Sequence, residues 1–298
     1  MLEATVKKIL QARVYEAACE TPISSAPFLS RRFNNQILIK REDLQPVFSF
    51  KIRGAYNKMA QLTDEQKAKG VIAASAGNHA QGLAMAAKLM GVKAVIVMPR
   101  ITPDIKVQAV RARGAKVVLK GDAFAAAAEH AQELIKEHGY TYIPPFDDID
   151  VVAGQGTIGV EILRQHSGRL DAIFIPVGGG GLIAGVAAYV KYLRPDIKII
   201  GVEAEDSACL KAALEAGERV VLDQVGVFAE GVAVAQIGEV PFSLVRDLVD
   251  DVIIVNTDEM CAAVKDIFED TRAVAETSGA LSLAGLKKYV QQTGAEGE

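Results

Sequence analysis

The sequence predicts an α/β protein, with parallel or mostly parallel sheets that are flanked by helices and divided between two packed lobes. One observation is that short β-rich runs alternate with helical patterns along nearly the whole chain, which is typical of parallel sheets covered by helices. A second is that the β-rich runs are almost continuously apolar, as in strands buried on both faces. A third is the length, because 298 residues, 50% of them hydrophobic, can form more than one core.

Eight strands are expected from the apolar runs, and helical patterns lie around and between them. The strands are predicted at residues 37–40, 71–75, 94–99, 116–120, 142–144, 172–177, 198–204 and 252–256. The helices are predicted at residues 1–18, 51–62, 80–90, 105–113, 123–138, 182–193, 208–216 and 258–271. The turn-rich segment Pro144–Asp148 is the best break between two lobes, because a new set of strands begins after it.

The composition excludes several classes of partner. A net charge of −4 argues against nucleic acid or an anionic membrane surface as the main partner. The three cysteines are scattered and give neither a disulfide framework nor a zinc spacing, which indicates a reducing compartment. The N-terminal segment has no signal-peptide core, and no apolar run approaches the ~20 residues that span a bilayer. We therefore expect a soluble cytoplasmic protein.

Lys51 is the lysine around which we expect the site to be organised. It stands at a predicted helix start, where the helix dipole is unfavourable for a cation, and Phe48, Phe50 and Ile52 surround it with apolar side chains. Desolvation and the positive helix end both favour a free amine that can form a Schiff base. The alternative is a surface lysine whose aliphatic stem covers its apolar neighbours.

Two turns further along could hold an anionic ligand. Gly178–Gly181 join a predicted strand to a predicted helix, so several backbone N–H groups can approach one phosphate at a helix N-terminus. In the turn Ser75–His79, Ser75 and Asn78 add polar side chains, which suits a carboxylate and one oriented oxygen. The alternatives are a tightly packed glycine turn and ordinary helix capping by Ser75 or Asn78. His79 receives no catalytic role.

Two other motifs are interpreted as structural. Gly154–Gly159 match the dinucleotide fingerprint, but the residues before them make a poor strand and Asp171 stands before the next strand rather than after it. We interpret this motif as a helix start and reject NAD. The acidic residues Asp147, Asp148 and Asp150 are interpreted as a solvated turn, because a metal site would add further ligands nearby.

The lysine, the asparagine turn and the glycine loop occur in the order found in the fold type II pyridoxal-phosphate enzymes, which the whole chain resembles. Among these enzymes the sequence is similar to the threonine dehydratases, and two of the matching stretches look like the biosynthetic branch. The matching stretches are Lys40–Asp43, Ser49–Ala55, Ser75–Gly82, Pro176–Leu182, Val202–Lys211 and Phe228–Val234, of which the last two carry the likeness to the biosynthetic branch.

The resemblance implies pyridoxal 5′-phosphate as the cofactor, bound between a large lobe of residues 1–42 and 146–298 and a small mobile lobe of residues 43–145. Lys51 would be the catalytic, Schiff-base lysine. The other cofactor-binding residues would be Phe50, Asn78 at the phenolic oxygen of the ring, Gly178, Gly179, Gly180, Gly181 and Leu182 around the phosphate, and Glu276, whose task is open. The substrate-binding turn would comprise Ser75, Ala76, Gly77, Asn78 and His79.

The resemblance also implies a reaction, namely the dehydration and deamination of L-threonine, and of L-serine, to 2-oxobutanoate or pyruvate and ammonia. In the biosynthetic enzymes this is the first step of isoleucine synthesis. Related racemases place a serine at the position of Ala76, so alanine there favours elimination. The expected partner is a small amino-acid substrate, and the expected assembly is a homo-oligomer, either a dimer or a tetramer.

The sequence departs from the threonine dehydratases near its end. Those enzymes carry a hydroxyl residue facing the pyridine nitrogen and a C-terminal regulatory module, and neither occurs before Glu298. We therefore expect a catalytic domain without the regulatory module. One alternative is a serine dehydratase or another fold type II lyase or synthase. A second is an inactive binding protein that keeps the fold, which the missing pyridine-nitrogen partner favours.

Overall fold

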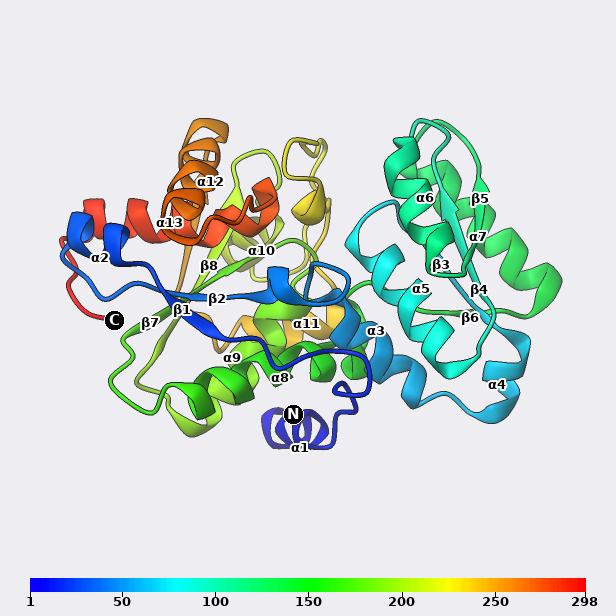
Figure 1. The fold of residues 1–298 in the computed structure, drawn as a ribbon, viewed down its shortest axis with the longest axis horizontal. Helices are drawn as coiled ribbons and strands as arrows, with labels where there is room; N and C mark the ends of the chain where they lie inside the picture. The colour runs from blue at the N-terminus through cyan, green and yellow to red at the C-terminus, as the bar shows by residue number, and fades with distance from the viewer.

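The computed structural model describes all 298 residues and contains three sheets (Figure 1). A parallel sheet has the strand order β5 (Lys116–Leu119), β4 (Ala94–Met98), β3 (Val71–Ala74) and β6 (Thr141–Tyr142). A second parallel sheet has the order β7 (Ala172–Pro176), β8 (Lys198–Ala204) and β9 (Asp251–Val255). Strands β1 (Ile23–Ser25) and β2 (Leu38–Lys40) form an antiparallel pair. The prediction of mostly parallel sheets is therefore confirmed.

The helices cover both parallel sheets. They are α1 (Leu2–Leu10), α2 (Pro27–Phe33), α3 (Lys51–Ala60), α4 (Asp64–Lys69), α5 (Asn78–Met90), α6 (Asp104–Ala112), α7 (Phe124–His138), α8 (Ile149–Gln165), α9 (Gly181–Leu193), α10 (Cys209–Ala216), α11 (Glu239–Val245), α12 (Thr257–Thr271) and α13 (Thr277–Thr293), with short 3₁₀ turns η1 (Glu42–Leu44) and η2 (Glu230–Val232). None of these helices is long and apolar enough to cross a membrane.

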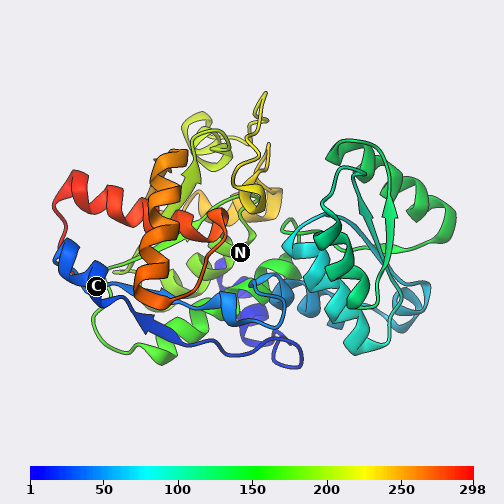
Figure 2. The same ribbon diagram turned by 45° about the horizontal axis from the view of Figure 1, so that its top comes forward.

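The two parallel sheets stand at opposite ends of the molecule (Figures 1 and 2). The four-stranded sheet lies with α4 to α7 at one end, and the three-stranded sheet lies with α8 to α13 at the other. Helix α3 joins the two halves, because it packs against α5 on one side and α8 on the other. This arrangement agrees with a two-lobed chain, while the lobe boundaries at residues 42/43 and 145/146 remain a prediction.

Both faces of the sheet are buried at its two central strands, β3 and β4, as the continuous apolar runs predicted. Because side chains alternate along a strand, Val71 and Ala73 of β3 lie in the core that includes α3 and α5. Ile72 and Ala74 lie in the core on the other face, with α7. All four β3 residues are at most 2% exposed. The strand is therefore held between two helical layers, and its carboxyl end runs directly into the turn before α5.

All eight predicted strands occur within two residues of their expected ends, but β1 was not predicted. A three-residue strand gives almost no periodicity, and β1 is defined mainly by its pairing with β2. The predicted helix start at Gly154 is wrong, because α8 begins at Ile149 after Asp148 caps it by accepting hydrogen bonds from the N–H groups of Asp150 and Val151. The segment preceding Gly154 is therefore helical and cannot be the strand that a dinucleotide fingerprint needs.

The glycines of this motif serve helix packing. A Cβ at Gly154 would lie 2.7 Å from the backbone of α3, and a Cβ at Gly156 would lie 2.6 Å from Ile9 of α1. Gly185 of α9 faces the same contact, with its Cβ position 2.4 Å from the carbonyl oxygen of Val152. Helices α3, α1 and α9 can therefore approach α8 only because these positions lack side chains.

The acidic residues near Pro145 are not a solvated turn, so that prediction is also wrong. Asp148 and Asp150 both pair with Lys58 of α3, at 2.7 and 3.3 Å, and Asp150 also pairs with Lys8 of α1. Asp147 accepts a hydrogen bond from the N–H group of Val240 at 2.9 Å. These carboxylates fix the start of α8 against α1, α3 and α11. The sequence could not show this, because each partner is at least 90 residues away.

Candidate active site

A cavity of about 880 Å³ opens between the two halves of the molecule. Three helices begin at its wall, since Lys51, Asn78 and Gly181 are the first residues of α3, α5 and α9 and all three line it. Each helix N-terminus carries partial positive charge and free N–H groups. The structure brings the following predicted site residues together at the wall: Phe50, Lys51, Asn78, Gly178, Gly179, Gly180, Gly181, Leu182 and Glu276.

Lys51 lies in this wall at the start of α3, as predicted, with its ammonium nitrogen 5.3 Å from the centre of the Phe50 ring. The expected enclosure by Phe48 and Ile52 is wrong, because Phe48 is exposed and Ile52 is buried in the core with α5.

The ammonium nitrogen of Lys51 donates a hydrogen bond to the carbonyl oxygen of Pro145 at 3.2 Å. Burial lowers the pKa of Lys51 from 10.5 to about 8, although the nearby carboxyl of Glu276 opposes this shift. The amine is therefore partly neutral near pH 8, as a nucleophile or a general base requires.

The glycine loop forms a cradle of unpaired donors. The backbone N–H groups of residues 178–183 have no acceptor within the protein. Gly180 has a φ of +87°, which favours glycine, and a Cβ at Gly179 would lie 2.2 Å from the ring of Phe146. These positions tolerate no side chain, and the converging N–H groups fit a phosphate. The site therefore fits a ligand that carries one.

A second set of free donors lies at the N-terminus of α5. The N–H groups of residues 78–80 also lack acceptors in the protein. The side chain of Asn78 donates from Nδ2 to Oε1 of Glu276 at 2.7 Å. Ser75, Ala76 and Gly77 form the turn before it but do not line the cavity. The turn can thus receive a carboxylate mainly through its backbone.

His79 points away from the cavity. Its ring is buried, and Nε2 lies 2.8 Å from the carbonyl oxygen of Ile143. Burial, with a smaller effect from the charge on Lys51, lowers the pKa of His79 to about 4, so the ring is neutral at pH 7 and donates this hydrogen bond. A contact between His79 and substrate must therefore come from its backbone.

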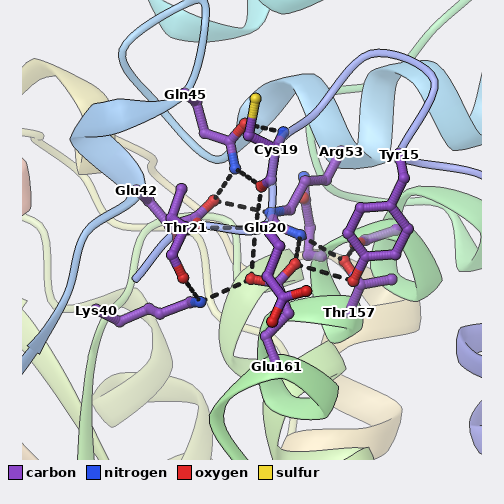
Figure 3. Close-up of polar contacts among 12 residues, drawn as sticks. Tyr15, Cys19, Glu20, Thr21, Lys40, Glu42, Gln45, Arg53, Thr157 and Glu161 are labelled. Atoms are coloured by element: carbon purple, nitrogen blue, oxygen red, sulfur yellow. Dashed lines mark hydrogen bonds and ion pairs between the residues drawn. The ribbon is translucent and has the colours of Figure 1, made fainter. Parts of the chain in front are cut away.

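Sequence reasoning missed a buried network of charges beneath Lys51 (Figure 3). Arg53, which is 0% exposed, lies one half-turn further along α3. It donates to both oxygens of Glu42, each at 2.8 Å, and to both oxygens of Glu161, at 2.6 and 3.0 Å. The only signal for Arg53 in the sequence was its position two residues after Lys51, within the stretch Ser49–Ala55.

Three further residues extend this Arg53 network toward other parts of the chain. Lys40 of β2 pairs with Glu161 at 2.6 Å, and Thr157 accepts from Arg53 at 3.1 Å. Tyr15 donates to Glu161 at 2.9 Å, and its pKa rises to about 12 because the phenol is buried beside that carboxylate. The network joins the N-terminal segment, β2, η1, α3 and α8, so it fixes the first turn of α3 and with it Lys51.

Replacing Arg53 by methionine should destabilise the protein by about 3–5 kcal/mol, because Glu42 would lose its ion pair and the buried Glu161 would lose one of its two cations. Chemical denaturation of the purified variant measures the change. The control is Arg169→Met, which removes an exposed pair with Asp171 and should cost less than about 1 kcal/mol. Similar losses for both variants would show that the network contributes little.

The pKa of Lys51 can be tested on cofactor-free protein by labelling with an amine reagent as a function of pH. Labelling of Lys51 should show a midpoint near pH 8, well below that of exposed lysines. The unfolded chain binds this proton up to about 10.5, so the free energy of unfolding should also rise with pH between about 8 and 10.5. A midpoint above 10 would contradict the inferred desolvation.

Comparison with known proteins places this geometry in a family. Residues 14–298 match the family model described as "Pyridoxal-phosphate dependent enzyme". The chain is 59% identical over 293 residues to the biosynthetic L-threonine dehydratase of Salmonella typhimurium, which covers 98% of this chain and 57% of that protein. It is 56% identical to the chloroplastic biosynthetic threonine dehydratase of Arabidopsis thaliana, over 96% of this chain and 48% of that protein. The chain thus spans about half the length of these relatives.

Solved structures with the same fold include enzymes of different activity. The processed threonine deaminase isoform 2 of Solanum lycopersicum superposes with a TM-score of 0.97 at 49% identity, covering 100% of this chain and 86% of that one. Maize serine racemase superposes with a TM-score of 0.92 at 31% identity, covering 99% of this chain and 90% of that one.

Proposed function

We propose an activity for this chain from one premise: the chain belongs to the family of pyridoxal-phosphate dependent enzymes. The observation that carries the proposal is the wall of the cavity, which includes both a lysine with a lowered pKa and a glycine cradle of five unpaired N–H groups, those of residues 178–182. We propose that residues 178–182 hold the phosphate of the cofactor and that Lys51 carries the cofactor covalently. Phe50, Leu182 and Asn78 would line its ring.

The proposed reaction is the dehydration and deamination of L-threonine, and more weakly of L-serine, to a 2-oxo acid and ammonia. It is supported by relatives named biosynthetic threonine dehydratase at 59% and 56% identity. Because those relatives are named biosynthetic, we propose that the reaction is the first step in the synthesis of isoleucine from threonine. We further propose that the protein acts in the cytoplasm and as a homo-oligomer, either a dimer or a tetramer.

The residues of the wall have separate tasks in this reaction. Bound pyridoxal phosphate supplies a group that delocalises the negative charge left on Cα of the amino acid. The free N–H groups before and within the first turn of α5 would bind the substrate carboxylate and fix its orientation. The amine of Lys51, neutral above pH 8, would take the Cα proton as the general base, after which the β-hydroxyl leaves.

A covalent test and an activity assay check the proposal together. Borohydride reduction followed by digestion should place the cofactor on Lys51, and the native chain should release 2-oxobutanoate from L-threonine. Lys51→Ala should lose at least about 10²–10⁴-fold of this turnover, since a positioned general base contributes that much. A label on another lysine, or no keto acid from threonine, serine or another β-substituted amino acid, would overturn the assignment.

Racemisation is the second candidate, because maize serine racemase has the same fold at 31% identity. Elimination needs one base at Cα, whereas racemisation needs a second acid or base across the cofactor plane. Ala76, in the turn before Asn78, carries a methyl group that can neither donate nor accept a proton. This residue favours dehydration.

The unmodified chain should accordingly form little or no D-amino acid, and Ala76→Ser should introduce measurable racemisation while dehydration persists. Chiral chromatography of residual substrate after partial turnover measures both variants, with α-proton exchange followed in heavy water. Substantial D-threonine or D-allothreonine from the unmodified chain would mean that another group serves the second face.

A further inference from the structure

The stability of helix α13 does not explain why a glutamate, Glu276, stands at its start. It precedes α13 and its backbone carbonyl accepts the first hydrogen bonds of that helix, yet its side chain makes no capping bond. Glutamate is not among the residues preferred for capping at this position. Burial raises the pKa of Glu276, which means that the carboxylate is held there at a cost in free energy. Its presence calls for a contact outside its own helix.

That contact crosses the cavity. Oε1 of Glu276 accepts the hydrogen bond from Nδ2 of Asn78 at 2.7 Å, so it joins the start of α13 to the start of α5. Both Asn78 and Glu276 line the cavity beside Lys51. An ion pair between Lys106 of α6 and Glu230 of η2 links the same two halves of the molecule.

The contact determines which atoms of Asn78 remain for a ligand. An amide can present either an N–H donor or its oxygen, and the two orientations differ only by a flip. A carboxylate can only accept, so Glu276 selects the orientation in which Nδ2 faces it. One N–H of Nδ2 is then used and the second remains free at the cavity wall. Without the carboxylate, the amide oxygen could turn toward an anionic oxygen of the ligand and repel it.

We propose that Glu276 is a positioning residue: it holds the Asn78 amide in the donor orientation and so prepares it for an anionic ring oxygen of the cofactor. This inference rests on the proposed function, because the cofactor must be pyridoxal phosphate for the free N–H to meet such an oxygen. In this proposal Glu276 acts through the side chain of Asn78 on the opposite wall, and it transfers no proton.

The carboxylate also influences Lys51, which provides an independent readout. The charged groups that act on Glu276 are Lys106 of α6, Glu230 of η2 and Lys51 of α3. Of the charges near Lys51, that of Glu276 raises its pKa against the effect of burial. Any loss of this carboxylate should therefore lower the labelling midpoint of Lys51 in cofactor-free protein below that of the unmodified chain. A residue that only capped α13 would not move this midpoint.

The test compares Glu276→Gln with Glu276→Ala in the full chain. Glutamine keeps an oxygen that can accept from Asn78 but can also present its own N–H, so it should weaken the affinity for pyridoxal phosphate less than alanine does. Alanine should weaken that affinity about tenfold, as expected when one oriented hydrogen bond is lost. Both should lower the Lys51 midpoint, and neither should reduce the free energy of unfolding of cofactor-free protein, because a buried carboxylate is removed.

The matched control is Glu230→Gln, which removes an acid from the same side of the cavity without touching Asn78; its cofactor affinity should not change. Unchanged cofactor affinity in Glu276→Ala would overturn the proposal. An equal loss of affinity in Glu230→Gln would also overturn it, because the loss would then come from removing a negative charge and not from the orientation of Asn78. If the unmodified chain binds no pyridoxal phosphate, the proposed function fails instead, and the two failures are thereby distinguished.

Discussion

The buried ion pairs of Arg53 hold together the segments on which the site depends. Arg53 and Lys40 face Glu42 and Glu161, so two positive and two negative side chains balance in a region where Arg53 and Glu161 are fully buried. Burying these charges costs desolvation, which the hydrogen bonds between them offset. Their partners come from the N-terminal half and from α8, so the network can form only when the two meet. Lys51 is two residues from Arg53 on the same helix, so its position depends on this network.

The second constraint is the convergence of three helix N-termini on one cavity. Helices α3, α5 and α9 all begin at its wall, and their positive ends favour anions and disfavour a protonated lysine. A ligand with two separated anionic groups can satisfy two of these ends. The amine at the third end lies beside the ring of Phe50, and Glu276 is the charged group that acts on it. The same arrangement therefore selects the ligand and prepares the nucleophile.

The sequence predicted the parts of this site that depend on local chemistry. Gly178–Gly181 and the lysine at a helix start were recognisable because turn geometry and helix ends act within a few residues. The Arg53 network was not, since its members are separated by 11 to 146 positions and each alone resembles an ordinary charged residue. The start of α8 was misplaced for a related reason. Glycines inside that helix exist to admit neighbouring helices, and a single sequence cannot distinguish packing glycines from turn glycines.

The fold leaves the choice of reaction to a few side chains. Enzymes named as deaminases and racemases superpose on this chain, so the frame that binds the cofactor does not by itself determine what happens at Cα. What differs must lie where the substrate is held. Here one wall provides an amine with a lowered pKa, and the first turn of α5 provides free backbone donors. A site with a base on one side only can remove a proton from Cα but cannot return one to the other face. The proposed elimination of the β-substituent requires only that one base.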